Sequence, residues 1–214
     1  MDDKIILEII SILDKKKLEL GSPVFDLIKI IGNDPFKILI STIISLRTRD
    51  EITIQSSKKL FKFLKSPNDI INISVKQISE AIYPCGFYNR KSIQIKQICI
   101  SLINNYDSKI PDDLETLLTF KGIGRKTANL ILSRGFNIPA ICVDTHVHRI
   151  SNRFGYIKTK TPEQSEFKLM NKLPKKYWIN YNLILVALGQ SICKPINPKC
   201  DKCPISKLCE KIIS

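Results

Sequence analysis

One stretch near the middle of the chain, Phe120 to Leu132, restricts the possible folds more than any other. It reads Phe-Lys-Gly-Ile-Gly-Arg-Lys-Thr-Ala-Asn-Leu-Ile-Leu, and helical apolar spacing resumes from Thr127 to Leu132, after the turn at 122–124. Just before this stretch, Asp112 and Glu115 have the spacing of a capping box, which predicts a short helix ending near residue 118. The sequence therefore predicts two helices joined by a tight hairpin.

This hairpin has the composition of an anion-binding turn. Glycine adopts positive φ without strain and lets a backbone approach a ligand closely, as Gly122 and Gly124 would do here. The second helix begins with N–H groups that lack intrahelical partners, and these attract a phosphate. Such a hairpin can hold a DNA phosphate without reading any base. An ordinary helical corner inside a core fits the same pattern equally well.

Two further side chains could carry chemistry. Lys126 stands at the start of the second helix, where the helix dipole disfavours the ammonium charge, and a neutral lysine can form a Schiff base. A solvated lysine at a helix start is the alternative. Asp144, in Val-Asp-Thr-His, precedes another helical pattern, where an aspartate is also an ordinary N-cap.

The rest of the chain is also helical in pattern, and strand signals are scarce, so we predict an all-α protein. Asp34-Pro35 has the composition of a helix start, and Ser74 with Gln77 forms a capping box. The additional helices are expected at residues 4–20, 36–46, 50–61, 78–82, 89–104, 161–173 and 181–191. The helices 36–46 and 181–191 are almost entirely apolar, which predicts that both are buried.

Four cysteines near the end of the chain have the spacing Cys-x6-Cys-x2-Cys-x5-Cys. They are Cys193, Cys200, Cys203 and Cys209. This set has one Cys-x-x-Cys knuckle, whereas structural zinc sites usually combine two, and four thiolates also hold iron–sulfur clusters. The other cysteines, Cys85, Cys99 and Cys142, have apolar neighbours, and we predict that they are buried thiols.

The net charge of +14 favours a polyanionic partner, although a lysine- and isoleucine-rich composition also arises in AT-rich genomes. The N-terminus lacks the pattern of a signal peptide, and no apolar run is long enough to span a bilayer. We therefore expect an intracellular protein without a membrane partner, whose cysteines are thiols or metal ligands rather than disulfides.

Three motifs in series, Lys121 to Ala128, Val143 to His146 and the cysteine set, resemble the endonuclease III family of DNA base-excision glycosylases. The resemblance extends over nearly the whole chain. It implies a helix–hairpin–helix DNA glycosylase fold with two helical domains and a cleft between them. The implied domains are a six-helix barrel at 28–138 and a cluster domain made of 1–27 and 139–214. The four cysteines would hold a [4Fe-4S] cluster, with zinc as the alternative.

The resemblance also implies an activity, that of a bifunctional DNA glycosylase and AP lyase acting on oxidised pyrimidines. Lys126 would attack the sugar C1′, and β-elimination would then break the strand 3′ to the abasic site. Asp144 would stabilise the developing charge. Arg47 would fill the gap left by a flipped base, and Phe87 would insert beside it. The commonest bacterial pattern has Gln and Leu at these two positions, which leaves the base preference open.

Further contacts with DNA phosphates are expected around the hairpin and the cysteine loop. These residues are Lys121, Gly122, Gly124, Arg125, Lys194 and Lys199. The expected partner is double-stranded DNA with damaged bases or abasic sites, bound by a monomer in the cytoplasm or nucleoid of a prokaryote.

Two alternatives are a monofunctional thymine or uracil mismatch glycosylase and a DNA-binding module without catalysis. Lys126 argues against the first, because thymine-mismatch glycosylases lack this lysine. The presence of both Lys126 and Asp144 argues against the second, because a binding module without catalysis requires neither residue. An adenine-mismatch glycosylase is disfavoured as well, because Thr42 stands where those enzymes carry a glutamate.

Overall fold

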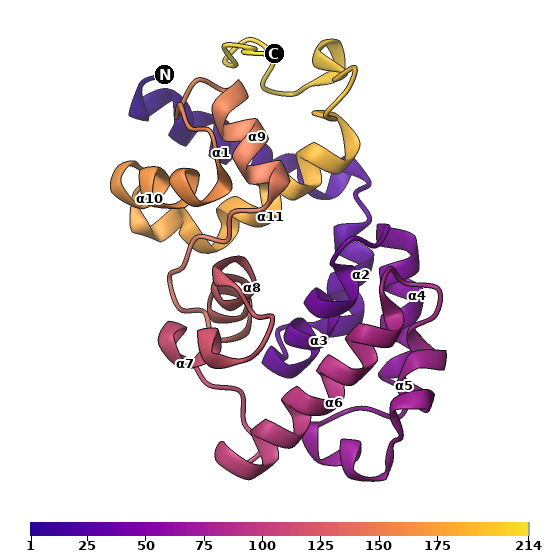
Figure 1. Cartoon of the computed structure of the whole chain (residues 1–214). Coiled ribbons are helices and arrows are strands. Elements are labelled where there is room, and N and C mark those ends of the chain that lie inside the picture. The colour runs from indigo at the N-terminus through magenta and orange to yellow at the C-terminus, as the bar shows by residue number, and fades with distance from the viewer. Residues whose placement is uncertain (214) are drawn as a thin grey trace. The chain divides into compact units, whose positions relative to one another are not determined.

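The computed structural model describes residues 1–213, and within them it contains helices and loops but no strand, as predicted for an all-α protein (Figure 1). The α-helices are α1 Asp3–Lys16, α2 Val24–Ile31, α3 Pro35–Ser45, α4 Asp50–Leu60, α5 Val75–Ile82, α6 Tyr88–Asn105, α7 Leu114–Thr119, α8 Arg125–Leu130, α9 Thr145–Arg153, α10 Pro162–Lys172 and α11 Trp178–Ser191. The shorter turns are η1 Leu18–Leu20, η2 Pro67–Asn72, the π-helical η3 Ile131–Gly135, η4 Lys175–Tyr177 and η5 Cys200–Lys202. Over the described residues, no helix is both long and apolar enough to cross a membrane.

The chain forms two compact units, and the first of them combines both ends of the sequence. It comprises Met1–Phe25 and the chain from Ile138 onward. Its core joins the apolar face of α1 to α9 and α11, through residues such as Ile6, Ile9, Val147 and Leu188. The N-terminal helix is therefore an integral part of the unit that carries the four cysteines of the C-terminal set.

The second unit, Asp26–Asn137, is organised around α3. This helix packs against α4, α6, α8 and η3, and eight of its residues from Phe36 to Ile44 are buried, as its apolar sequence predicts. Its start is also as predicted. Pro35 occupies the first turn, and the Asp34 side chain accepts hydrogen bonds from the backbone N–H groups of Phe36 at 2.9 Å and Lys37 at 3.2 Å.

Other helix boundaries differ from the sequence expectation. The N-cap of α7 is Asp113 and not Asp112, because the Asp113 carboxylate accepts from the Thr116 N–H at 2.8 Å. The first helix ends at Lys16 and continues as η1, which closes at Gly21 with φ of +59°. Helix α2 was not predicted, although Ser22-Pro23 has the composition of a helix start and the Val24 N–H donates to Ser22 Oγ at 3.4 Å.

Candidate active site and cysteine pocket

The hairpin between α7 and α8 is fixed by two apolar anchors that alternate with exposed residues. Phe120 and Ile123 are each only 6% exposed, and the ring centroid of Phe120 lies 5.4 Å from that of Tyr106. Lys121 and both glycines of the turn are exposed. The hairpin is thus packed on one side, while its glycines remain accessible on the other.

The two glycines of this turn differ in what the fold requires of them. Gly122 has φ of +82°, and a Cβ there would lie 2.5 Å from the side-chain nitrogen of Gln94, which itself donates to the Lys121 carbonyl at 3.0 Å. Gly124 is the N-cap of α8 with φ of −103°, and a Cβ there would meet no atom within 4 Å. The fold explains Gly122, whereas only a closely bound ligand would require glycine at position 124.

The two candidate catalytic residues both lie at helix starts. Helix α8 begins at Arg125, two residues earlier than its apolar pattern indicates, so Lys126 is its second residue, and the Lys126 side chain is exposed. Asp144 is the N-cap of α9, and its Oδ1 accepts from the Val147 N–H at 2.8 Å. Asp144 therefore has a structural role whatever else it does, and any catalytic role must be separated from it.

The structure brings together the two residues considered for base replacement. Arg47 follows α3 and Phe87 precedes α6, and both have left-handed backbones, with φ of +51° and +58°. The guanidinium carbon of Arg47 lies 5.7 Å from the centroid of the Phe87 ring. Both side chains are exposed. Left-handed conformations of residues other than glycine cost energy and concentrate at functional sites.

The loops that carry these residues are joined to each other at Gly86. Its N–H donates to Thr48 Oγ1 at 3.0 Å, and a Cβ at this position would collide with the carbonyl oxygen of Arg47. Gly86 was not singled out from the sequence as a residue that holds the two loops together. A glycine immediately before a predicted functional residue is the signal that could have identified it.

Thr42 and the three cysteines outside the C-terminal set are buried in the protein interior. Thr42 is buried in α3, and its hydroxyl donates to the Ile38 carbonyl at 2.7 Å. The thiols of Cys85, Cys99 and Cys142 are buried, as predicted. Burial raises the pKa of Cys99 to about 12 and also raises that of Cys85, which keeps both thiols protonated and unreactive.

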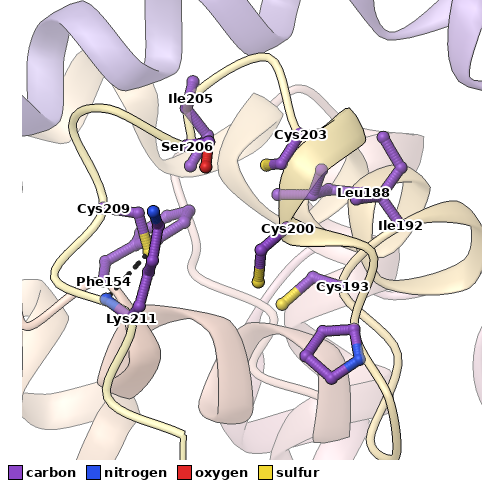
Figure 2. Close-up of a pocket in the computed structure, with 11 residues that line it drawn as sticks. Phe154, Leu188, Ile192, Cys193, Cys200, Cys203, Ile205, Ser206, Cys209 and Lys211 are labelled. Atoms are coloured by element: carbon purple, nitrogen blue, oxygen red, sulfur yellow. Dashed lines mark hydrogen bonds between the residues drawn. The ribbon is translucent and has the colours of Figure 1, made fainter.

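The four C-terminal cysteines line a single pocket (Figure 2). The other residues around it are mostly apolar and include Phe154, Leu188, Ile192 and Ile205. Burial raises the pKa of the Cys203 thiol to about 11 and raises that of Cys209 in the same direction. A metal centre bound here would have to displace these protons, as thiolate ligation always requires.

Two arginines of α9 hold the loop at the start of this cysteine set. Arg149 Nη2 donates to the Cys193 carbonyl at 2.7 Å. Arg153 donates to the carbonyls of Lys194 at 2.7 Å and Pro195 at 2.8 Å, and its Nη1 lies 3.5 Å from Cys193 Sγ. The side chains of Lys194 and Lys199 are exposed on this loop. The helix that Asp144 caps therefore also positions the cysteine loop.

The chain is similar to known proteins over most of its length. Residues 40–175 match the model of the HhH-GPD superfamily of base excision DNA repair proteins. Endonuclease III of Thermotoga maritima is 46% identical over 177 residues, which cover 83% of each chain. The chain belongs to the endonuclease III family. Endonuclease III of Bacillus subtilis is 32% identical over 86% of this chain and 84% of its own.

Solved structures agree with this assignment. The endonuclease III chain in a trapped covalent intermediate with DNA is 30% identical to this chain, with a TM-score of 0.76. The match covers 91% of this chain and 96% of that endonuclease III chain. A non-covalent endonuclease III–DNA complex is also 30% identical, with a TM-score of 0.77 and coverage of 93% and 95%. The family and fold predicted from the motifs are confirmed. The chain is a bifunctional DNA glycosylase and AP lyase of base excision repair.

Proposed function

We propose that the substrates are oxidised pyrimidines and abasic sites in duplex DNA, with Lys126 as the nucleophile. The observation that carries this proposal is an exposed lysine at the second position of α8, directly after an exposed glycine hairpin. The similar endonuclease III trapped as a covalent DNA intermediate supports it, since this lysine supplies an amine that can form such a bond.

The proposed reaction proceeds through a Schiff base. The neutral Nζ of Lys126 attacks C1′, the N-glycosidic bond breaks, and the base leaves with the bonding electrons and takes up a proton. The sugar ring then opens, and the imine forms between Nζ and C1′. Loss of a proton from C2′ expels the 3′ phosphate, which breaks the strand, and water hydrolyses the imine to release the lysine.

Asp144 is proposed to stay ionised near the sugar, where its carboxylate stabilises the positive charge that develops as the base departs. It would also assist the proton transfers of the elimination.

Arg47 and Phe87 are proposed to replace the stacking that is lost when the damaged nucleotide leaves the helix. The contact between their side chains and their shared exposure support a joint role. Arginine offers hydrogen-bond donors to the unpaired base, and phenylalanine offers a stacking face. We propose that Lys121, Arg125, Lys194 and Lys199 contact phosphates, together with the backbone at Gly122 and Gly124. We propose that the protein binds DNA as a monomer. We also propose that it acts inside the cell, because its substrate is DNA.

A [4Fe-4S] cluster is proposed in the cysteine pocket. Four thiols around one pocket fit the all-cysteine donor set of such a cluster. We propose the cluster rather than a zinc ion because the set contains one Cys-x-x-Cys pair, whereas structural zinc sites usually combine two. When bound, the cluster would fix the loop that presents Lys194 and Lys199 to the backbone of DNA.

Replacing one cluster ligand should remove the visible absorption of the cluster and lower the thermal stability of the protein. We expect Cys203→Ser to purify without the brown colour of an iron–sulfur protein, with a lower unfolding temperature. The buried Cys99→Ser is the matched control, and it should retain the visible absorption. Iron and zinc analysis of the purified wild type decides between the two metals, because a colourless, stable protein with stoichiometric zinc would contradict the cluster.

The two hairpin glycines should respond differently to alanine. Gly122→Ala forces a left-handed alanine against Gln94, so we expect it to destabilise the hairpin by about 1–2 kcal/mol, measured by thermal unfolding. Gly124→Ala should cost less stability than Gly122→Ala, about 0.5 kcal/mol for the poorer N-cap. It should nevertheless weaken binding to an abasic duplex, because its methyl group would stand between the backbone and a phosphate. Unchanged DNA affinity in Gly124→Ala would mean that no ligand approaches this glycine.

A panel of lesions tests the proposed substrate class. Duplexes with thymine glycol, dihydrouracil, a thymine mismatch or an abasic site would be incubated with the enzyme, and base release and strand breakage would be measured separately. We expect release of the two oxidised pyrimidines, with breakage at the abasic site. Release of mismatched thymine without strand breakage would instead indicate a monofunctional mismatch glycosylase.

A further inference from the structure

Lys91, near the start of α6, is a lysine that the proposed chemistry does not use, and it is only 4% exposed. Lysine is rarely buried to this extent unless its charge has partners. The ammonium has three N–H donors, and three oxygen atoms lie within hydrogen-bond distance. These are the carbonyls of Ile44 at 2.7 Å and Leu46 at 2.6 Å, and Thr48 Oγ1 at 3.0 Å.

These acceptors surround Arg47 in the sequence. Leu46 lies immediately before it, Thr48 lies immediately after it, and Ile44 belongs to the last turn of α3. A left-handed arginine persists only when the surrounding structure holds it in place. The Lys91 ammonium supplies this restraint, since it binds the chain on both sides of the left-handed residue.

The same lysine is connected to the second loop. Its backbone N–H donates to the Phe87 carbonyl at 3.0 Å, in the first turn of α6. The Thr48 hydroxyl that accepts from Lys91 also accepts from the Gly86 N–H at 3.0 Å. Lys91 therefore lies at the junction of the two loops. Burial lowers the pKa of Lys91, and the neighbouring Cys85 opposes that shift. The three acceptors satisfy the N–H donors of the ammonium.

We propose that Lys91 is a positioning residue for extrusion of the damaged base, because its ammonium holds Arg47 and Phe87 together as one rigid wedge. This proposal rests on the wedge role proposed above for Arg47 and Phe87. Lys91 itself is buried beneath the loops and acts only through them. Replacing Lys91 should therefore slow reactions in which a base must first be extruded from the stack.

The test compares Lys91→Met with a matched lysine of the same helix. Lys96 also donates from Nζ to two backbone carbonyls, those of Ile70 at 2.7 Å and Ile73 at 2.6 Å, but these stabilise η2. Both variants should lose some thermal stability. We expect Lys91→Met to lower the single-turnover rate of thymine glycol release by about 10–100-fold, the usual effect of misplacing a group that orients the substrate. Lys96→Met should stay within about twofold of the wild type, as expected for a site that does not couple to the wedge.

A second measurement reports directly on insertion of the wedge into DNA. In a duplex with 2-aminopurine opposite an abasic site, insertion beside the unpaired base changes the fluorescence of 2-aminopurine. We expect this change with the wild type and Lys96→Met, and a reduced change with Lys91→Met at saturating protein. A full fluorescence change with Lys91→Met would overturn the proposal, since it would show that the wedge inserts without this lysine.

A double-mutant cycle separates this proposal from the proposed wedge. If Lys91 acts through Arg47 and Phe87, then Lys91→Met should have no further effect on the rate once both are alanine. The same loss in that background would overturn the positioning role and leave the wedge intact. A wild-type rate in the Arg47→Ala/Phe87→Ala variant would overturn the wedge itself, and the role of Lys91 with it.

A second substitution provides the test if Lys91→Met does not fold. Thr48→Val is nearly isosteric, leaves the lysine in place and removes the hydroxyl that Lys91 and the Gly86 N–H share. We expect it to reduce thymine glycol release and the 2-aminopurine response in the same direction as Lys91→Met. Wild-type values for both would overturn the proposal.

Discussion

Strand cleavage at an abasic site should be lost in Lys126→Ala. The variant has no amine to form the Schiff base, so the rate of β-elimination should fall by at least about 10³-fold, which is typical of the loss of a catalytic nucleophile. Affinity for the same duplex should change little, because a single phosphate or sugar contact is removed. Cleavage would be followed on a labelled duplex under single-turnover conditions, and affinity by fluorescence anisotropy.

Lys76→Ala is the matched control for this variant. Lys76 is also an exposed lysine at the second position of a helix, here α5, and it has no proposed role in DNA binding or catalysis. It should cleave like the wild type, which would show that the loss in Lys126→Ala is not a general effect of removing one positive charge. Substantial cleavage by Lys126→Ala would mean that another amine is the nucleophile.

Asp144→Asn should reduce catalysis while preserving the fold. Asparagine caps helices about as well as aspartate, so the bond to the Val147 N–H is retained and the unfolding temperature should stay close to that of the wild type. The charge is lost, and the rate of base release should fall by roughly 10²–10⁴-fold, the usual contribution of a group that assists proton transfer. Asp144→Ala removes the cap as well and should cost about 1 kcal/mol of stability in addition.

The control for Asp144→Asn is Asp113→Asn, at the N-cap of α7. Asp113 accepts from the Thr116 N–H at 2.8 Å, the same length and sequence offset as the bond from Val147 to Asp144. Asp113→Asn should retain full base release. Equal activity of Asp144→Asn and the wild type would limit Asp144 to its structural role as a cap.

Local rules predicted most of the fold. The caps at Asp34 and Ser74 are correct, because side-chain capping depends on residues only two or three positions apart. The N-cap of α7 is wrong by one residue, since two adjacent aspartates offer the same carboxylate and the local pattern does not distinguish them. Helix α2 was missed although local signals mark both of its ends, a Ser-Pro pair at 22–23 before it and Gly32 with φ of +58° after it.

Long-range contacts account for what could not be predicted. The left-handed backbones of Arg47 and Phe87 are held through Lys91 and Gly86, which lie far from Arg47 in the sequence. In a sequence this rich in lysine, nothing distinguishes a buried lysine from an exposed one. The cysteine spacing predicted that these four residues belong together, and they line one pocket, but Arg149 and Arg153 of α9, which hold the start of their loop, could not be identified from that spacing.

The chemistry of Lys126 is the central claim, and borohydride trapping tests it most directly. Borohydride reduces a Schiff base to a stable amine, so wild-type enzyme with an abasic duplex should yield a covalent protein–DNA adduct. Peptide mapping should place the adduct on Lys126, and Lys126→Ala should yield none. An adduct mapped to a different residue, or no adduct from wild-type enzyme that binds and cleaves the duplex, would contradict the proposed mechanism.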